Sequence, residues 1–299
     1  MWQRYKYHAL LHIIIFLWGF TGILGKLIHK DALYIVWYRV LIAFIALGLF
    51  LFFVGKSVHL TKKTALRTFG VGFIVAIHWI SFYYAIQLST ASLAILCLST
   101  TTLHVSWLAP LVMKQKFSLR QFFMGLLVIA GISLVSFNFN GQEIFALVLG
   151  LFSALCAAFF SVFNAKLSED TSADKLTFYE MIAAFIFVSF LLLCTGKLTF
   201  SALQLTVTDF LWLLFLGVVC TSFAFLATIV IVRKLGAFTV SLSINLEPIY
   251  TIILAIILLK EHKLLSLNFY IGAVLILLVL LINGLMKHYE VKSSDKVQH

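Results

Sequence analysis

The sequence predicts an all-α integral membrane protein whose ten transmembrane helices form two inverted-topology repeats of five helices each. The first observation is composition: 63% of the residues are hydrophobic and 11% are charged, whereas soluble domains carry about 25% charged residues. The second is that apolar stretches of about 20 residues, enough to cross a bilayer, follow one another along almost the whole chain. The third is an internal repeat, because residues 70–138 align with residues 217–285 at a constant offset of 147.

The apolar stretches are continuous, which favours helices over spanning β-strands of about 9–11 alternating residues. The connections between them are short and leave no room for a soluble catalytic domain. The four cysteines lie inside apolar stretches without disulfide or metal spacing, so we expect no metal and no cofactor. We expect helices near residues 9–28, 33–54, 68–87, 92–113, 121–138, 144–165, 176–195, 210–232, 238–259 and 268–286.

The positive charges indicate how the chain is oriented. With the N-terminus on the cytoplasmic side, the inner segments carry sixteen Lys and Arg residues and the outer segments five. Cytoplasmic loops are enriched in these residues, so we expect both termini in the cytoplasm and a bacterial cytoplasmic (inner) membrane as the location. The net charge of +11 is then a topology signal. No basic run is long enough to predict a nucleic-acid partner.

The repeats predict two domains, residues 1–140 and residues 141–299, the second ending in a short cytoplasmic tail. The front of each repeat aligns at a slightly different offset: residues 39–45 match residues 180–186 at an offset of 141. Because each repeat holds an odd number of helices, the second copy is inverted in the membrane. Inverted repeats are typical of secondary transporters, whose substrate site lies near the midplane between the copies.

The chain resembles the drug/metabolite transporter superfamily, specifically its EamA type, over nearly its whole length. The resemblance rests on Trp18-Gly19, Arg39, Gly70, Tyr83-Tyr84-Ala85, Leu246-Glu247-Pro248, Glu261 and Gly272. It implies export or facilitated movement of small metabolites, including amino acids, through a central cavity. The first repeat departs from the pattern, with Thr100-Thr101 opposite Glu247-Pro248 and Lys114 opposite Glu261.

Glu247 is the sharpest candidate for function, since a mid-membrane charge costs at least ~2.5–3.5 kcal/mol and should face a cavity or a partner. Ser243 and Tyr250 are predicted to share its helical stripe. Glu247 either binds a proton or substrate, or bonds a neighbouring helix. His104, with Thr100 and Thr101 on its stripe, either lines the pore as a group that titrates near neutral pH or bonds across helices.

On the third helix, Trp79 and Tyr83 share one face with Gln87, and His78 lies beside them; this set either lines a cavity or packs. Trp18 either caps the cavity or packs beside a stripe of glycines. Arg39 either snorkels to the interface or pairs with a substrate carboxylate. The full set of candidate substrate-binding residues is Trp18, His78, Trp79, Tyr83, Thr100, Thr101, His104, Phe160, Asn164, Ser243, Glu247 and Tyr250.

These features predict a secondary transporter or facilitator that exports a small polar or amphipathic metabolite, with amino acids as the leading class, by alternating access. The expected partners are this small-molecule substrate and the lipid bilayer; protons are a weaker hypothesis resting on Glu247 and His104, and the oligomeric state stays open. The alternatives are a non-transporting membrane scaffold or binding protein of the same fold, and a transporter of another metabolite or drug class. No residues have the spacing of a catalytic constellation, so we expect no enzyme and no catalytic residue.

Overall fold

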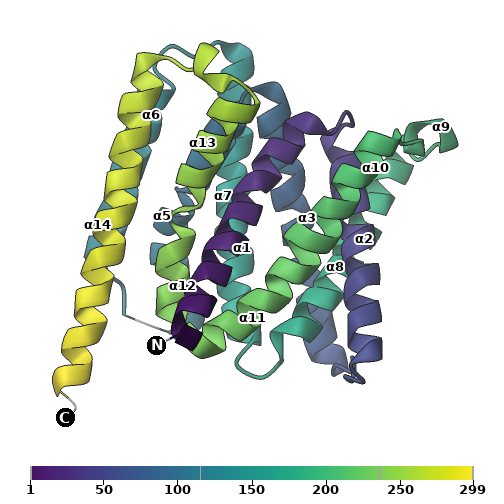
Figure 1. Ribbon diagram of the computed structural model, residues 1–299, viewed down its shortest axis with the longest axis horizontal. Helices are drawn as coiled ribbons and strands as arrows, with labels where there is room; N and C mark the ends of the chain where they lie inside the picture. Colours follow the sequence, from purple (N-terminus) through teal and green to yellow (C-terminus); the bar gives the residue numbers. More distant parts are fainter. Residues whose placement is uncertain (1, 115, 236, 298–299) are drawn as a thin grey trace.

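The computed structural model describes residues 2–114, 116–235 and 237–297, and the elements in these ranges are all helices. The α-helices run roughly side by side, with both termini at the same end of the molecule (Figure 1). We call this the terminal end and the opposite one the distal end. The helices are α1 (Trp2–Leu27), α2 (Ala32–Phe53), α3 (Lys62–Leu88), α4 (Ala91–Leu98), α5 (Thr101–Met113), α6 (Leu119–Val135), α7 (Gly141–Leu167), α8 (Ala173–Cys194), α9 (Phe200–Leu203), α10 (Val207–Leu214), the π-helix η1 (Phe215–Phe223), α11 (Ala224–Leu235), α12 (Ala237–Ile244), α13 (Glu247–Leu258), the 3-10 helix η2 (Glu261–Lys263) and α14 (Leu267–Val297).

The described residues contain eight helical segments long and apolar enough to cross a membrane, counting α4–α5 and α10–η1–α11 as one each. Two shorter apolar helices, α6 and α13, follow the remaining predicted segments. The prediction of an all-helical membrane protein is therefore confirmed. The count of ten spans stays a prediction, because α6 and α13 are shorter than a typical span of about 20 residues.

Two of the predicted helices are interrupted near their middles. The segment predicted at 92–113 breaks at Ser99–Thr100, and the segment predicted at 238–259 breaks at Asn245–Leu246. The break between α12 and α13 is visible in Figure 1. Pro248 stands in the first turn of α13, where its missing N–H costs nothing. At the other break, the hydroxyl of Thr100 bonds the Cys97 carbonyl at 2.7 Å, a local bond that competes with regular helix.

The prediction of one continuous polar stripe through Ser243, Glu247 and Tyr250 is therefore wrong. Ser243 lies on α12 and donates to the carbonyl of Thr239 at 2.9 Å. Glu247 is the first residue of α13. The stripe of the fourth segment is interrupted in the same way, since Thr100 precedes α5 and Thr101 begins it.

The repeat is visible in the elements themselves. Helices α2 and α8 each have 22 residues and begin at positions that the 141-residue offset aligns. The two helix breaks also correspond, and the two non-glycine residues with positive φ, Lys114 (54°) and Lys260 (55°), follow the broken helices at matching places. The two halves thus share these two irregularities, whereas the π-helix η1 corresponds to part of the continuous α-helix α3.

Packing between the halves is reciprocal as well. Helix α3 packs on α8, and its counterpart η1 packs on α2. A Cβ on Gly72 of α3 would lie 2.6 Å from the carbonyl oxygen of Glu180, and a Cβ on Gly217 of η1 would lie 3.3 Å from that of Arg39. The absence of a side chain therefore allows the same close approach twice, once in each half.

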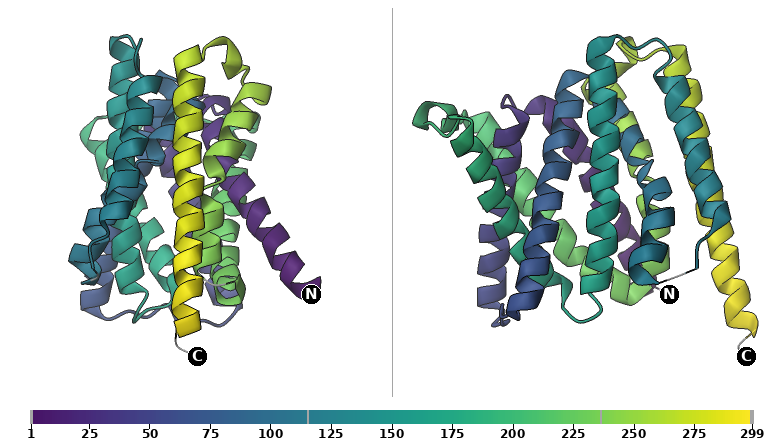
Figure 2. Two further views of the ribbon diagram at one scale, coloured as in Figure 1. Left: turned by 90° about the vertical axis from the view of Figure 1, so that its left-hand side faces the viewer. Right: turned by 180° about the vertical axis from the view of Figure 1, so that it is seen from behind.

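The fifth helices, α6 and α14, pack against each other along one side of the molecule (Figures 1 and 2). Gly131 lies against Ile276, whereas Gly272 lies against Val135. Residue numbers therefore increase along α6 in the direction in which they decrease along α14. The two helices are therefore antiparallel. Helix α1 is inclined to its neighbours, as the left view of Figure 2 shows.

Candidate functional site

Arg39 lies inside the molecule on α2, with 4% of its surface exposed. Its guanidinium carbon stacks 3.8 Å from the centre of the Trp79 ring. Nε donates to the hydroxyl of Thr221 at 3.0 Å and Nη1 donates to the hydroxyl of Tyr83 at 3.2 Å. The interpretation that Arg39 snorkels to the membrane interface is therefore wrong, because neighbouring helices hold its head group in the interior.

The elements around Arg39 explain how this position is built. Trp79 and Tyr83 are four residues apart on α3, so they point from one face toward the guanidinium, as the sequence predicts. Thr221 comes from η1, where its hydroxyl also donates to the carbonyl of Leu216 at 2.8 Å. π-helical geometry is frequently found at functional sites, and Thr221 lies within the nine-residue π-helix η1.

Glu247 is half-buried at the start of α13. Its carboxylate makes no hydrogen bond within the part of the chain that the structure describes, and the charge of Arg39 is close enough to act on it. The two groups come from different halves of the chain. Together they place one cation and one carboxylate in a common region of the interior.

His78 belongs to a second cluster beside Arg39, whose charge also acts on it. Its Nδ1 lies 2.8 Å from the hydroxyl and 2.9 Å from the carbonyl of Ser153 on α7. The ring of Phe160, which follows Ser153 along α7, lies 5.3 Å from the imidazole ring of His78, centre to centre. The structure therefore brings His78 and Phe160 together beside the cluster of Arg39, Trp79 and Tyr83, with His78 bonded across helices.

Trp18 on α1 is half-buried and its ring lies 6.1 Å from that of Phe225 on α11. The glycines that follow it are close-contact positions: a Cβ on Gly19 would meet the Thr251 hydroxyl at 2.9 Å, and one on Gly25 would meet the Tyr83 ring at 2.9 Å. The packing interpretation of this glycine stripe is confirmed.

The remaining predicted residues lie apart from Arg39. Thr101 donates to the Ala154 carbonyl at 3.2 Å, and His104 is half-buried with its ring edge-on to Trp107. The Tyr250 hydroxyl lies 2.9 Å from Nδ1 of His12 on the exposed part of α1. Asn164 donates to Glu180 at 3.3 Å.

Thr221 is absent from the residues that the sequence predicts for the site, and Arg39 is predicted there only as an interface anchor or a partner of a substrate carboxylate. Thr221 carries no signal in the sequence, since a hydroxyl in an apolar stretch usually bonds its own backbone. Arg39 did carry one: a permanent charge within an apolar stretch is expensive and needs partners.

Glu261, one of the residues on which the family resemblance rests, has a structural role. Its carboxylate accepts from the backbone N–H groups of Ala91 and Ser92 at 2.8 and 3.1 Å and so caps α4.

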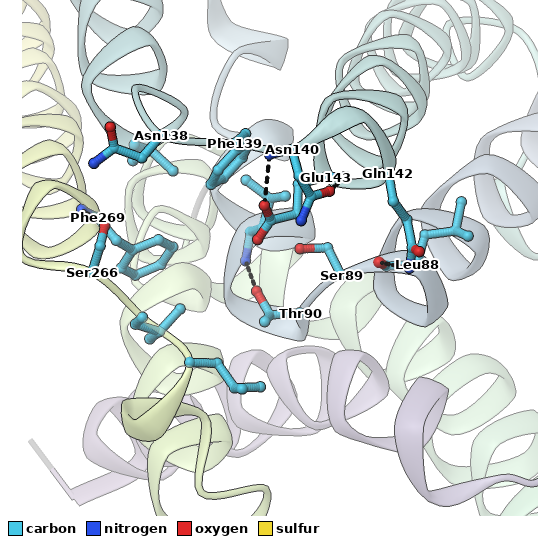
Figure 3. A pocket seen from close by; sticks show the side chains of 14 residues that line it. Leu88, Ser89, Thr90, Asn138, Phe139, Asn140, Gln142, Glu143, Ser266 and Phe269 are labelled. Carbon is cyan, nitrogen blue, oxygen red and sulfur yellow. Dashed lines mark hydrogen bonds between the residues drawn. The ribbon is translucent and has the colours of Figure 1, made fainter.

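A polar cavity of about 380 Å³ lies at the distal end, away from these residues (Figure 3). It is bounded by the α3–α4 connection, the α6–α7 connection and the start of α14, and it contains none of the predicted site residues. Asn140 and Glu143, which are drawn in Figure 3, cap α7 reciprocally at 2.9 and 3.0 Å. Thr90 and Ser266, which also line the cavity, likewise bond backbone N–H groups at the starts of α4 and α14.

Comparison with known proteins adds the family. A solved structure described only as "Crystal structure of protein" has a TM-score of 0.66 and 14% sequence identity, and the match covers 94% of this chain and 98% of that one. At this identity the likeness shows the fold alone. No curated protein matches the chain. A family model matches it twice, over residues 6–137 and 144–285, which correspond to the two repeats; the chain therefore belongs to the EamA-like transporter family.

Proposed function

We propose that the protein is a secondary transporter or facilitator that exports small zwitterionic metabolites, with amino acids as the leading class. The family match supports a membrane transporter of small molecules. The observation that supports the substrate class is that Arg39 and Glu247, one cation and one carboxylate, lie close enough for their charges to act on each other. Each group would bind the opposite charge of a zwitterion.

The chemistry of the two groups is complementary to an amino acid. A guanidinium carries five N–H donors and binds carboxylates in a planar, bidentate way. Two of the Arg39 nitrogens, Nε and Nη1, donate to Thr221 and Tyr83; Nη2 makes no hydrogen bond within the described residues. Nη2 is therefore the atom that we assign to a substrate carboxylate. Glu247 would accept from the substrate ammonium group.

Trp79 and Tyr83 orient Arg39, and we assign Trp18, His78 and Phe160 to the apolar wall around the substrate side chain. Aromatic walls with a few placed polar groups are typical of small-molecule sites. Thr100, Thr101, His104, Ser243 and Tyr250 also stay assigned to the substrate path, further from Arg39.

The two repeats provide the mechanism. Arg39, Trp79 and Tyr83 come from residues 1–140, whereas Thr221 and Glu247 come from residues 141–299, so the site lies between the two proposed domains. In the inverted arrangement that we propose, exchange between two conformations would close the site on one side of the membrane and open it on the other. We further propose ten spans, cytoplasmic termini and a bacterial inner membrane, in line with the loop charges.

Transport assays with three matched compounds test the proposal. Proteoliposomes are loaded with phenylalanine, with phenethylamine, which lacks the carboxylate, or with hydrocinnamate, which lacks the amine. We expect the protein to increase the efflux of phenylalanine above that from protein-free liposomes loaded in the same way. The increase that the protein causes should be much smaller for both analogues. Equal efflux with and without the protein, across a panel of amino acids, would refute the proposal.

Two variants connect the result to the residues. Glu247→Gln should reduce phenylalanine efflux, since it removes the partner of the ammonium group. Glu143→Gln is the control, because Glu143 lies at the distal end in an exposed helix cap. Should both variants transport phenylalanine at the wild-type rate, Glu247 would have no part in the substrate site.

A further inference from the structure

The proposed function does not use one buried carboxyl, that of Glu180, which lies apart from the Arg39 region. Glu180 lies on α8 with 3% of its surface exposed. Its backbone carbonyl is covered by Gly72 of α3, where even a Cβ would come within 2.6 Å. Because it is the eighth residue of α8, it lies roughly 10 Å from the start of the helix at a rise of 1.5 Å per residue. The group is thus sealed inside the terminal half of the molecule.

The hydrogen bonding of Glu180 is half complete. Nδ2 of Asn164 donates to Oε2 at 3.3 Å. Within the described residues, the other carboxyl oxygen, Oε1, and the amide oxygen of Asn164, Oδ1, are both buried and have no partner. Two acceptor oxygens of one interacting pair therefore both lack a hydrogen atom.

Within the described residues, no cationic side chain forms an ion pair with this carboxyl. Asn164 is the side chain that acts on it, and the helices that pack against α8 direct their charged groups elsewhere. Arg39 of α2 is bonded to Thr221 and Tyr83, and His78 of α3 is bonded to Ser153.

Other charged side chains of these helices and of α7 lie toward the helix ends; among them are Lys62, Lys63 and Arg67 of α3, Lys166 of α7, Asp174 and Lys175 of α8, and Arg233 and Lys234 of α11. An ionised carboxylate in this environment would carry a large desolvation cost without compensation.

We propose that Glu180 and Asn164 form a proton-binding site, in which a neutral Glu180 donates its Oε1–H to Oδ1 of Asn164. One proton then satisfies both orphaned oxygens, and together with the Nδ2–Oε2 bond it completes a cyclic pair of acid and amide. A metal cation fits less well, since hard cations such as Ca²⁺ take six to eight oxygen ligands and no group of three or more His, Cys, Asp or Glu side chains gathers within the described residues.

The site offers a way to couple transport to protons, a consequence that rests on the proposed function. Helix α8, which carries Glu180, packs against α3 and α2 of the first repeat and against α11 of the second. Movement of one repeat against the other would admit water to the carboxyl, and Glu180 would then release its proton and take another when the seal closes again. One proton would bind and leave in each cycle.

Infrared spectroscopy of the purified protein in lipid tests the site without any substrate, so its outcome is independent of the transport proposal. At neutral pH we expect a C=O stretching band of a protonated carboxyl that shifts in D₂O. The band should lose one carboxyl in Glu180→Gln and stay unchanged in Glu169→Gln, a control whose exposed side chain pairs with Lys166 at 2.7 Å. A spectrum of Glu180→Gln identical to wild type in this region would overturn the proposal.

Asn164→Ala gives a second test that keeps the carboxyl and does not depend on how Glu180→Gln folds. Removing the amide takes away the acceptor for the Oε1–H, so the band should move in frequency. If the band of Asn164→Ala stays at the wild-type frequency, the two side chains do not share a proton and the proposal fails.

Discussion

Arg39 and Glu180 occupy equivalent backbone positions in the two repeats and carry opposite chemistry. Each is the eighth residue of a 22-residue helix, and the carbonyl of each lies against a glycine of the opposite repeat. The side chain of Arg39 is surrounded by Trp79, Thr221 and Tyr83, whereas that of Glu180 accepts a hydrogen bond from Asn164. The comparison shows that the repeat preserves the close backbone packing while the side chains that perform chemistry diverge.

The difference has a physical origin. Close helix packing depends on the small residues Gly72 and Gly217, so any copy of the fold must keep them or their equivalents. A side chain that points into the interior needs partners from other helices, and these can differ between copies. One half can therefore hold a permanent cation and the other a carboxyl that takes up a proton.

The largest effect is expected where the permanent charge is removed. Arg39→Ala should reduce the substrate affinity in transport by roughly 10- to 150-fold, because Nη2 is the nitrogen assigned to the substrate carboxylate and a hydrogen bond to a charged group contributes about 1.5–3 kcal/mol. The measurement is the KM for amino-acid efflux from proteoliposomes. Arg39→Lys keeps the charge but loses the planar fork, so it should fall between wild type and Arg39→Ala; a wild-type KM for Arg39→Ala would remove Arg39 from the site.

Substitution of the glycines tests the close helix packing that the two repeats share. Gly72→Val places a branched side chain against the Glu180 carbonyl and the Ala183 Cβ, which a Cβ alone would meet at 2.6 and 2.7 Å. Overpacking of this kind costs typically about 1–3 kcal/mol, and Gly217→Val should behave alike. Thermal unfolding in detergent measures the effect. Gly70→Val is the matched control on the same helix, since nothing lies within 4 Å of its Cβ position; equal melting temperatures for Gly70→Val and Gly72→Val would contradict the packing.

The fold and the site differ in how much of each could be predicted from the sequence alone. The repeat, the helix positions and the shared face of Trp79 and Tyr83 follow from hydrophobic pattern and spacing, which are local properties of the chain. The position of Arg39 could not be derived in this way. Whether an arginine near a helix end snorkels or turns inward depends on the residues across the bundle, here Thr221, which is 182 positions away.

The helix breaks show the same limit. Pro248 indicates a bend, yet the sequence cannot tell a kinked helix from two separate helices, and the polar stripe through Ser243 depends on that distinction. The break at Ser99–Thr100 has no proline and depends on hydroxyls that bond the backbone, an option that every serine and threonine has. Nor does the sequence show that Asn164 and Glu180 share orphaned oxygens.

A further difference between the repeats concerns Glu261, whose counterpart in the first repeat is Lys114. The Glu261 carboxylate accepts from two backbone N–H groups of α4 and from the Ser92 hydroxyl at 2.6 Å. Glu261→Gln removes the charge that favours a helix N-terminus and should lower the unfolding free energy by about 1–2 kcal/mol. Chemical denaturation in detergent gives the value. In Glu143→Gln, the exposed capping residue of α7, the loss should be smaller, about 0.5–1 kcal/mol; the reverse order would show that Glu261 does not hold α4.

The smallest effect on stability is expected for Glu180→Gln, at the position equivalent to Arg39. If Glu180 is neutral in the folded protein, Glu180→Gln replaces a buried O–H donor by a buried N–H donor of nearly the same shape, and the bond to Oδ1 of Asn164 can be kept. The unfolding free energy should then change by no more than about 0.5 kcal/mol, within the range of a neutral surface substitution. Asn164→Ala should cost more, about 1–3 kcal/mol, since it leaves the acid proton and both carboxyl oxygens unpartnered in a dry environment. Denaturation curves of the two variants at neutral pH decide the matter, because a strongly destabilised Glu180→Gln would mean that the ionised carboxylate is the form that the fold requires.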